Sequence, residues 1–141
     1  MTAKGLIQLV LDSFEAERSG DSEKGLSLIS DDFKVTEMFL GKGGAFPRFE
    51  GEELRKSIQE VYKIEGREYV FKNIAADEEN GVVFVEFVES YPDPKTGKVY
   101  RTPQVAVVEV KNGKLYRTRH YTDPRLSHEN LSEEDIEEAF K

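Results

Sequence analysis

Four strand-like segments follow one another in the second half of the chain, and the turns between them limit the folds that it can adopt. The segments cover residues 68–77, 82–91, 99–110 and 114–122. Asn80-Gly81 separates the first two segments and Asn112-Gly113 the last two, and Asn-Gly favours the positive φ angles of tight hairpin turns. The middle turn reads "PDPKTG". The second half therefore predicts an antiparallel meander of four strands.

The first half of the chain predicts three amphipathic helices and one strand. Thr2 can cap the first helix, which "SGD" ends, and Ser22 can open a short second helix. Apolar residues recur at helical spacing in the first and third helices, at Leu6, Leu9, Val10 and Phe14 and at Leu54, Ile58, Val61 and Tyr62. Residues 33–39 alternate as a strand does, and the glycine-rich "GKGGAFPRFEG" predicts a flexible loop.

A sheet with an apolar face must bury that face, and the three helices can cover it. The expected fold class is therefore α+β, a cone-shaped, curved antiparallel sheet covered by three N-terminal helices. We expect residues 1–141 to form a single domain in which 124–141 is a C-terminal tail. The tail should contain a short helix, because Ser132 and Asp135 have the spacing of a capping box.

Composition excludes several classes of function. The chain has no cysteine, so disulfides and sulfur-based zinc sites are absent, and no pattern indicates a metal or a cofactor. The net charge is -8 and the basic residues are scattered, which argues against nucleic acid as a partner. The chain has neither the order of a signal peptide nor an apolar run near the roughly 20 residues that span a bilayer, so we expect a cytoplasmic protein with no membrane partner.

The segment 82–91 is apolar on both faces, which predicts contacts on both sides of the sheet. One face groups Val83, Val85, Phe87, Glu89 and Tyr91, and the other groups Val82, Phe84, Glu86 and Val88. The first face should meet the helices. The second, with Leu115 and Tyr121, predicts a homodimer through the outer sheet face. We expect Glu86 to reach a partner or to pair with Arg117 or Arg119.

Chemistry-bearing side chains gather on the last predicted strand, in "KNGKLYRTRHYTDP". Because alternate residues of a strand share a face, Tyr116, Thr118, His120 and Thr122 form one row, and Leu115, Arg117, Arg119 and Tyr121 form the other. Glu37 interrupts the apolar row of residues 33–39 and should point inward, where a charge is costly unless it is paired or useful. The other histidine, His128, lies in the polar tail and predicts a solvated side chain.

Three stretches carry a resemblance to a known superfamily: "SGD" after the first helix, "FEGEELRKSIQEVY", and "KNGKLYRTRHYTDP" at the end of the meander. Over Leu6 to Pro124 the chain resembles nuclear transport factor 2-like proteins, in the branch of SnoaL-like polyketide cyclases, ketosteroid isomerases and limonene epoxide hydrolases. The resemblance implies a cone with a pocket at its open end. Members include isomerases, hydrolases, cyclases and proteins without catalysis, so function depends on the pocket.

The resemblance implies roles for three residues. His120 stands where the epoxide hydrolases carry a catalytic aspartate, and a histidine can also take or give a proton near neutral pH. Glu37 stands where the isomerases keep an aspartate base and the hydrolases a water-binding asparagine, and Glu89 stands where the hydrolases keep an acid. The alternatives remain open: a pocket histidine without chemistry, and glutamates at the rim of the sheet.

Some positions depart from the family pattern. The hydrolases hold an arginine two residues before their acid, and this arginine forms ion pairs with two acids. Phe87 stands at that position here, two residues before Glu89. Ser13 and Phe14 lie near the position of the isomerase tyrosine, and Ala106 lies near that of its protonated aspartate, so the pair that stabilises an enolate is missing. Neither reaction carries over whole.

Two functions remain open from the sequence. The first is an isomerase, cyclase or hydrolase that acts on a small apolar molecule through His120 and Glu37, with Glu89 in support. The second is a non-catalytic ligand-binding or dimerisation domain of the same fold. A cavity lined by Glu37 and His120 would favour the first, and a filled core the second. The expected ligand-binding residues are Val35, Phe39, Ile58, Tyr62, Phe87, Ala106, Val108, Tyr116 and Thr118.

Overall fold

A computed structural model describes residues 1–141 except the side chains of Ser127 and His128, so the prediction for His128 lies outside the described residues. The helices are α1 (Ala3–Ser19), α2 (Ser22–Leu28), α3 (Gly51–Val61) and α4 (Glu133–Ala139), with 3-10 turns η1 (Lys42–Gly44) and η2 (Pro124–His128). The strands are β1 (Ile29–Glu37), β2 (Arg48–Glu50), β3 (Glu68–Asp77), β4 (Val82–Pro92), β5 (Val99–Lys111) and β6 (Lys114–Tyr121). The expected α+β class and the four-strand meander are confirmed.

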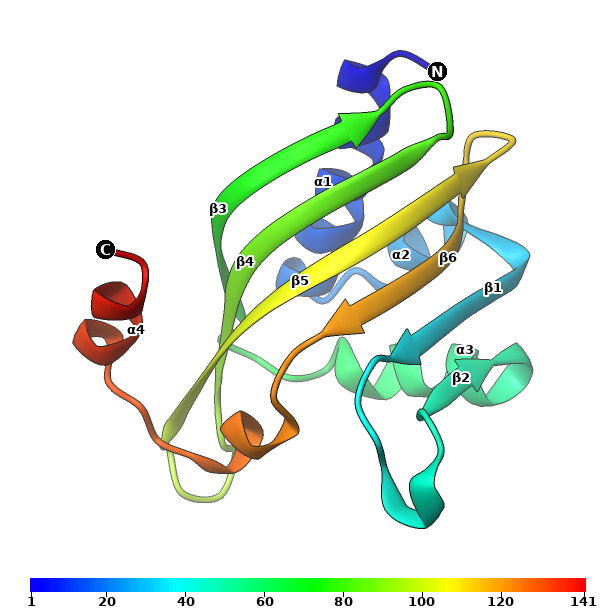
Figure 1. Cartoon of the computed structure of the whole chain (residues 1–141). Helices are drawn as coiled ribbons and strands as arrows, with labels where there is room; N and C mark the ends of the chain where they lie inside the picture. Colours follow the sequence, from blue (N-terminus) through cyan, green and yellow to red (C-terminus); the bar gives the residue numbers. More distant parts are fainter.

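The strands form one curved sheet in the order β2-β1-β6-β5-β4-β3 (Figure 1). Every neighbouring pair is antiparallel except β1 and β6, which run parallel, so the expectation of a fully antiparallel sheet is wrong. Hairpin turns set the directions of β3 to β6, but no turn joins β1 to β6. The turn pattern therefore carried no information about the direction of that pair.

The three N-terminal helices lie on the concave side of the sheet (Figure 1). Thr2 caps α1 by accepting a hydrogen bond from the Gly5 N–H, and Gly20 ends the helix with φ 77°. Leu6 and Val10 of α1 are buried against a core that includes Val85 and Phe87 of β4. The helices therefore cover one apolar face of the sheet, as the sequence predicted.

The first strand and the loop after it differ from the prediction. β1 begins at Ile29 rather than at residue 33, because Asp31 and Asp32 extend the strand with exposed side chains. The glycine-rich segment, predicted to be a loop, contains η1 and the short strand β2, which pairs Phe49 with Val35. Backbone pairing along an edge requires no alternation of apolar side chains, so the sequence pattern missed it.

A β-bulge reverses the expected orientation of the first residues of β6. The register shifts between Glu109 and Val110, where the partners are Arg117 and Leu115, and this leaves Tyr116 as the extra residue. Leu115 is buried and lines the interior, whereas the Tyr116 ring lies outside, 5.0 Å from Arg117 Cζ. The predictions of Tyr116 as a pocket residue and of Leu115 as an outer residue are therefore wrong, because one inserted residue exchanges the two faces.

The C-terminal tail covers part of the outer face of the sheet. Ser132 caps α4 by accepting a hydrogen bond from the Asp135 N–H, as the capping-box spacing predicted. Lys72 Nζ of β3 lies 2.7 Å from Glu137 Oε1, and Ile136 of α4 is buried. Val88, expected to be exposed without a dimer, is buried within this chain.

The expected ion pairs of Glu86 are also wrong. Glu86 accepts a hydrogen bond of 2.8 Å from Asn73 Nδ2 on β3. Arg117 and Arg119 bind Glu109 instead, through Oε2 at 2.9 and 2.6 Å. The reason is register: Glu109 lies on β5 directly opposite Arg117 of β6, and Arg119 is the next residue of β6 on the same face. Glu86 lies on β4, one strand further away.

Candidate functional site

A cavity of about 700 Å³ opens between the inner face of the sheet and helices α1 and α3. Its wall is largely apolar and aromatic, which is the ordinary character of a small-molecule site. The predicted residues that line it are Val35, Phe39, Ile58, Tyr62, Phe87, Ala106, Val108 and Thr118. The inner end of the cone is packed, since Phe87, Ala106 and Val108 are almost fully buried. The core and the cavity thus share these residues.

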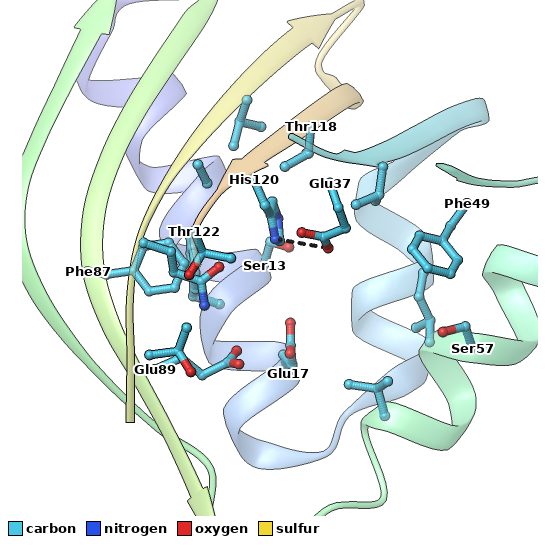
Figure 2. Close-up of a pocket in the computed structure, with 18 of the residues that line it drawn as sticks. Ser13, Glu17, Glu37, Phe49, Ser57, Phe87, Glu89, Thr118, His120 and Thr122 are labelled. Atoms are coloured by element: carbon cyan, nitrogen blue, oxygen red, sulfur yellow. Dashed lines mark ion pairs between the residues drawn. The ribbon is translucent and has the colours of Figure 1, made fainter. Parts of the chain in front are cut away.

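Glu37 and His120 lie side by side on the cavity wall. They are direct partners in the parallel pairing of β1 and β6, so their side chains leave the sheet on the same face. His120 Nδ1 is 3.7 Å from Glu37 Oε1, and Figure 2 shows both side chains pointing into the cavity. The side chains keep 24% and 30% of their surface exposed for Glu37 and His120 respectively, toward the cavity that they line. Both side chains therefore face the cavity and lie close together, as expected, but the expectation that Glu37 lies on the wall opposite His120 is wrong, because β1 pairs directly with β6.

The protonation states of this pair are set by burial. Burial lowers the pKa of His120 to about 4, so its imidazole is neutral at pH 7. Burial, and then the negative charge of Glu89, raises the pKa of Glu37 to about 7. The proton of the pair therefore resides on Glu37, which can release or take it near neutral pH. The separation of 3.7 Å exceeds a direct hydrogen bond, so the two groups are free to contact a third.

A second polar cluster lines the same cavity. Arg67, in the turn before β3, has a side chain only 4% exposed. Its Nη1 lies 3.0 Å from Glu89 Oε2 on β4 and 3.5 Å from Glu17 Oε1 on α1. Figure 2 shows the carboxyl groups of Glu17 and Glu89 directed into the cavity. One buried cation thus lies between carboxyl groups from a helix and a strand.

Phe87 stands where the family has an arginine, which implied that Glu89 has no cation beside it. This cluster shows that the implication is wrong. Arg67 supplies the cation from a different element, and the second acid is Glu17 rather than a residue of β6. Burial and the charge of Glu89 raise the pKa of Glu17 to about 7, against the opposing effect of Arg67. The arginine therefore compensates one of the two carboxylates.

The sequence contained a signal for both missed residues. Glu17 follows Val10 and Phe14 at helical spacing, so it lies on the apolar stripe of α1. Arg67 precedes Tyr69 by two positions, so it would share the inward orientation of Tyr69 if the strand pattern were extended by one residue beyond the predicted segment 68–77. A charged side chain on an apolar face requires a partner of opposite charge, so Glu17 and Arg67 together predict an ion pair.

The structure also bears on the oxyanion group that the family pattern lacked. Ser13 and Ala106, at the positions of the isomerase donors, line the cavity without supplying a tyrosine or a carboxylic acid there. Tyr69 of β3 does direct a buried hydroxyl into this region, where burial and the nearby carboxyl group of Glu17 raise the pKa of that hydroxyl. This hydroxyl is therefore present in the cavity, on a strand where the sequence did not place it.

The arrangement of helices and strands defines the class of protein: an α+β cone of the nuclear transport factor 2-like type. A family model of the SnoaL-like domain matches residues 10–118. The chain therefore belongs to the SnoaL-like domain family.

Solved structures support the same fold. A candidate isomerase from Bacillus subtilis aligns with a TM-score of 0.77 at 18% identity, over 90% of this chain and 92% of that one. An epoxide hydrolase of the limonene type from M. tuberculosis aligns with a TM-score of 0.72 at 19% identity, over 92% of this chain and 86% of that one. A candidate SnoaL-like polyketide cyclase from a Jannaschia species has a TM-score of 0.71 at 15% identity, over 93% and 94% of the two chains. No curated protein matches the chain.

Within the part of the chain that the structure describes, no helix is long and apolar enough to cross a membrane.

Proposed function

We propose that the protein binds a small, largely apolar molecule in the cone and catalyses proton transfer on it. The observation that carries the proposal is the pairing of Glu37 with His120 on the wall of an open cavity, 3.7 Å apart and with pKa values shifted in opposite directions. A base is most effective when its pKa lies near the working pH, and Glu37 meets that condition. Isomerisation, cyclisation and hydrolysis all need such a group.

Glu37 and His120 take different parts in this proposal. Glu37 accepts or returns the proton, because its pKa is about 7. His120 is neutral and therefore donates a hydrogen bond from one ring nitrogen and accepts at the other, so it orients the substrate or a water beside Glu37. Glu89 acts through its charge, which raises the pKa of Glu37, because its own carboxylate is bound to Arg67.

Three probe reactions test the proposal, each of which needs a proton transfer: hydrolysis of styrene oxide, isomerisation of 3-cyclohexenone, and hydrogen–deuterium exchange at the α-carbon of 1-tetralone. We expect wild-type protein to accelerate at least one of them and Glu37→Gln to remove that acceleration. If the probes bind the cavity and none reacts faster than in buffer, the proposal is wrong and the domain is a binding module.

We also propose a homodimer through the outer sheet face, over a smaller area than the sequence suggested. Phe84 and Tyr121 are 45% and 44% exposed there, beside Val105 and Val107, while α4 occupies the neighbouring part of the face. Such an apolar patch favours self-association. Sedimentation should give a dimer for wild type and a monomer for Phe84→Lys. A wild-type monomer at high micromolar concentration would contradict the proposal.

A further inference from the structure

The loop between β1 and β2, residues 38–47, exposes two large apolar side chains beside the cavity. Leu40 and Phe46 are 68% and 51% exposed, and Leu40 is the most exposed large apolar side chain among the described residues. Neither side chain lines the cavity in this structure, although Phe39 and Pro47, their immediate neighbours in the chain, both do. The exposed pair therefore lies next to the rim of the cavity.

The base of this loop is held by backbone hydrogen bonds at the two proposed catalytic residues. The Glu37 N–H donates to the Pro47 carbonyl oxygen at 2.8 Å, and the Met38 N–H donates to the His120 carbonyl oxygen at 2.8 Å. The first bond joins the two ends of the loop, and the second fixes its start to β6. A movement of the loop is therefore that of a flap hinged beside Glu37 and His120.

The tip of the loop is a closed turn that extends into open space. The Gly41 N–H donates to the Ala45 carbonyl oxygen at 2.8 Å, and η1 lies between these residues. Gly43 and Gly44 have φ 81° and 74°, and a Cβ at either position would meet no atom within 4 Å apart from those of its chain neighbours. The tip is therefore free of packing at these two glycines.

Leu40 and Phe46 lie on the two arms of the loop, between the fixed base and the closed tip, so they move together when the loop bends. Exposed apolar side chains gain free energy when they and a second apolar surface leave water together. The cavity offers such a surface beside the loop, because its wall there consists of Phe39, Pro47 and Phe49.

We propose that residues 38–47 form a lid that closes over an apolar ligand in the cavity through Leu40 and Phe46. The inference rests on the proposed function for the apolar character of the ligand, and it adds two ligand-contact residues and a conformational step to that function. Figure 1 shows the loop after β1 projecting past the end of that strand, so the lid is open in this structure.

Closure of the lid supplies a condition that the proposed reaction needs. The side chains of Glu37 and His120 keep 24% and 30% of their surface exposed. A closed lid separates them from bulk water, which strengthens the electrostatic interactions inside the cavity and prevents loss of a transferred proton to solvent. The backbone bonds at the base of the lid place this step directly beside the pair.

The composition of the chain allows a direct measurement of closure. The chain contains no tryptophan, so Phe46→Trp introduces a single indole on the lid. We expect tetralin, an apolar probe of two fused rings, to shift the emission of this indole to shorter wavelength, because the indole leaves water when the lid closes. Phe140→Trp is the matched control, because Phe140 lies at the end of α4 and does not line the cavity, and its emission should not respond.

A double variant, Leu40→Ser with Phe46→Ser, removes the apolar contacts of the lid and leaves the cavity wall unchanged. Titration followed by NMR gives the affinity of tetralin, which should fall about tenfold, as for two apolar side chains that are partly buried on binding. Val70→Ser removes a 50% exposed apolar side chain outside the cavity and should leave the affinity unchanged. Melting temperatures show whether the variants fold as wild type does.

An emission shift of Phe46→Trp on tetralin binding, together with weaker binding by the double variant, supports the lid. Tetralin binding without that shift, or with unchanged affinity in the double variant, overturns the lid and leaves the cavity and the proposed proton transfer in place. A shift that follows protein concentration instead of tetralin places Phe46 at an interface between copies of the chain, and also overturns the lid.

The outcomes separate the lid from the proposed function. Glu37→Gln tests proton transfer and should still bind tetralin, so a failure of catalysis alone leaves the lid intact. If tetralin does not bind wild type, the proposal of a small apolar ligand fails, and the lid fails with it.

Discussion

Glu37 and Glu109 lie on opposite faces of the same sheet, each beside a side chain of β6, and their pKa values shift in opposite directions. Glu109 faces outward and binds Arg117 and Arg119. Burial acts to raise its pKa, but the hydrogen bonds and the positive charges of Arg119 and Arg117 together hold the pKa of Glu109 below its ordinary value. Glu37 faces inward to the neutral His120, and its pKa rises to about 7.

The difference shows how one strand serves two purposes. Arg119 and His120 are consecutive, so they leave β6 on opposite faces. The arginine neutralises a carboxylate at the surface, while the histidine leaves the interior carboxyl without a cation. A carboxylate paired with cations holds its charge at any physiological pH. A desolvated carboxyl without one can exchange its proton.

The largest expected effect is on turnover, from Glu37→Gln. We expect the accelerated probe reaction to slow about 100-fold or more, since a general base commonly contributes that much. Glu109→Gln is the matched control, because it removes a carboxylate from the other face. Initial rates under saturating probe measure both. Equal rates for wild type and Glu37→Gln would mean that Glu37 takes no more part in turnover than Glu109 does.

His120→Ala should also abolish most of the turnover while the melting temperature stays within a few degrees, as expected of a cavity residue. Arg119→Ala removes the neighbouring side chain on the outer face and should leave the rate unchanged. Thermal melts and rates measured on the same preparations test this. A large fall in melting temperature with His120→Ala alone would indicate a structural histidine.

Glu37 and His120 should contribute to the pH dependence of the free energy of unfolding with opposite signs. A pKa raised to about 7 from the ordinary 4.5 means that the folded state holds a proton that the unfolded state has lost, so this contribution to stability declines as pH rises from about 4.5 to 7. His120, with a lowered pKa, contributes in the opposite sense, losing stability as pH falls from 6.5 towards 4.

Denaturant unfolding at pH 5 and pH 7 gives the free energy of unfolding of wild type and of Glu37→Gln. The variant lacks the Glu37 contribution and keeps those of His120 and Glu17. Between pH 5 and pH 7, the free energy of unfolding of Glu37→Gln should therefore rise relative to that of wild type by on the order of 1 kcal/mol, after allowance for the partial exposure of Glu37. No such gain would mean that Glu37 titrates as it does in water.

Glu89→Gln should produce a smaller effect, on the pH at which the reaction rate rises. The Glu89 charge contributes to the raised pKa of Glu37, so its removal should move the midpoint of the pH–rate profile below about 7. Glu86→Gln changes the same strand on the outer face and should leave the midpoint unchanged. A midpoint that moves upward in Glu89→Gln would contradict the assigned electrostatic coupling.

The smallest expected effect is that of Glu109→Gln on stability. Its ion pairs are at the surface, and such pairs contribute about 0 to 1 kcal/mol. Urea titration at low and at high salt measures this, and the difference between wild type and variant should shrink at high salt. A loss of several kcal/mol would mean that the outer pairs are as important to the fold as the core.

The sequence predicted those parts of the molecule in which local pattern and tertiary structure agree. Asn-Gly turns and alternating strands identified the meander, and the spacing of Leu6, Val10 and Phe14 identified α1. The inward orientation of His120 also agreed with strand parity, because no bulge lies between Thr118 and His120, whereas its direct pairing with Glu37 depends on the β1–β6 pairing that the pattern did not show.

The remaining features depended on contacts between distant segments. The bulge beside Glu109 displaced Tyr116, and nothing in a strand pattern marks where one residue is inserted. Arg67 was missed because it lies in a turn, where a polar residue is expected to be solvated. Its burial depends on Glu17 and Glu89, which come from two other elements.

The parallel pairing of β1 with β6 has a consequence for the order in which the protein acquires its activity. β1 and β6 are far apart in the sequence, so closing the loop between them is entropically costly and slow. The hairpins of the meander join strands that are neighbours in the sequence and close locally. On a ribosome, β1 emerges before β3 to β6 and keeps one edge unpaired until β6 has been made. Because Glu37 and His120 are partners in that pairing, the candidate catalytic pair is among the last contacts to form during folding.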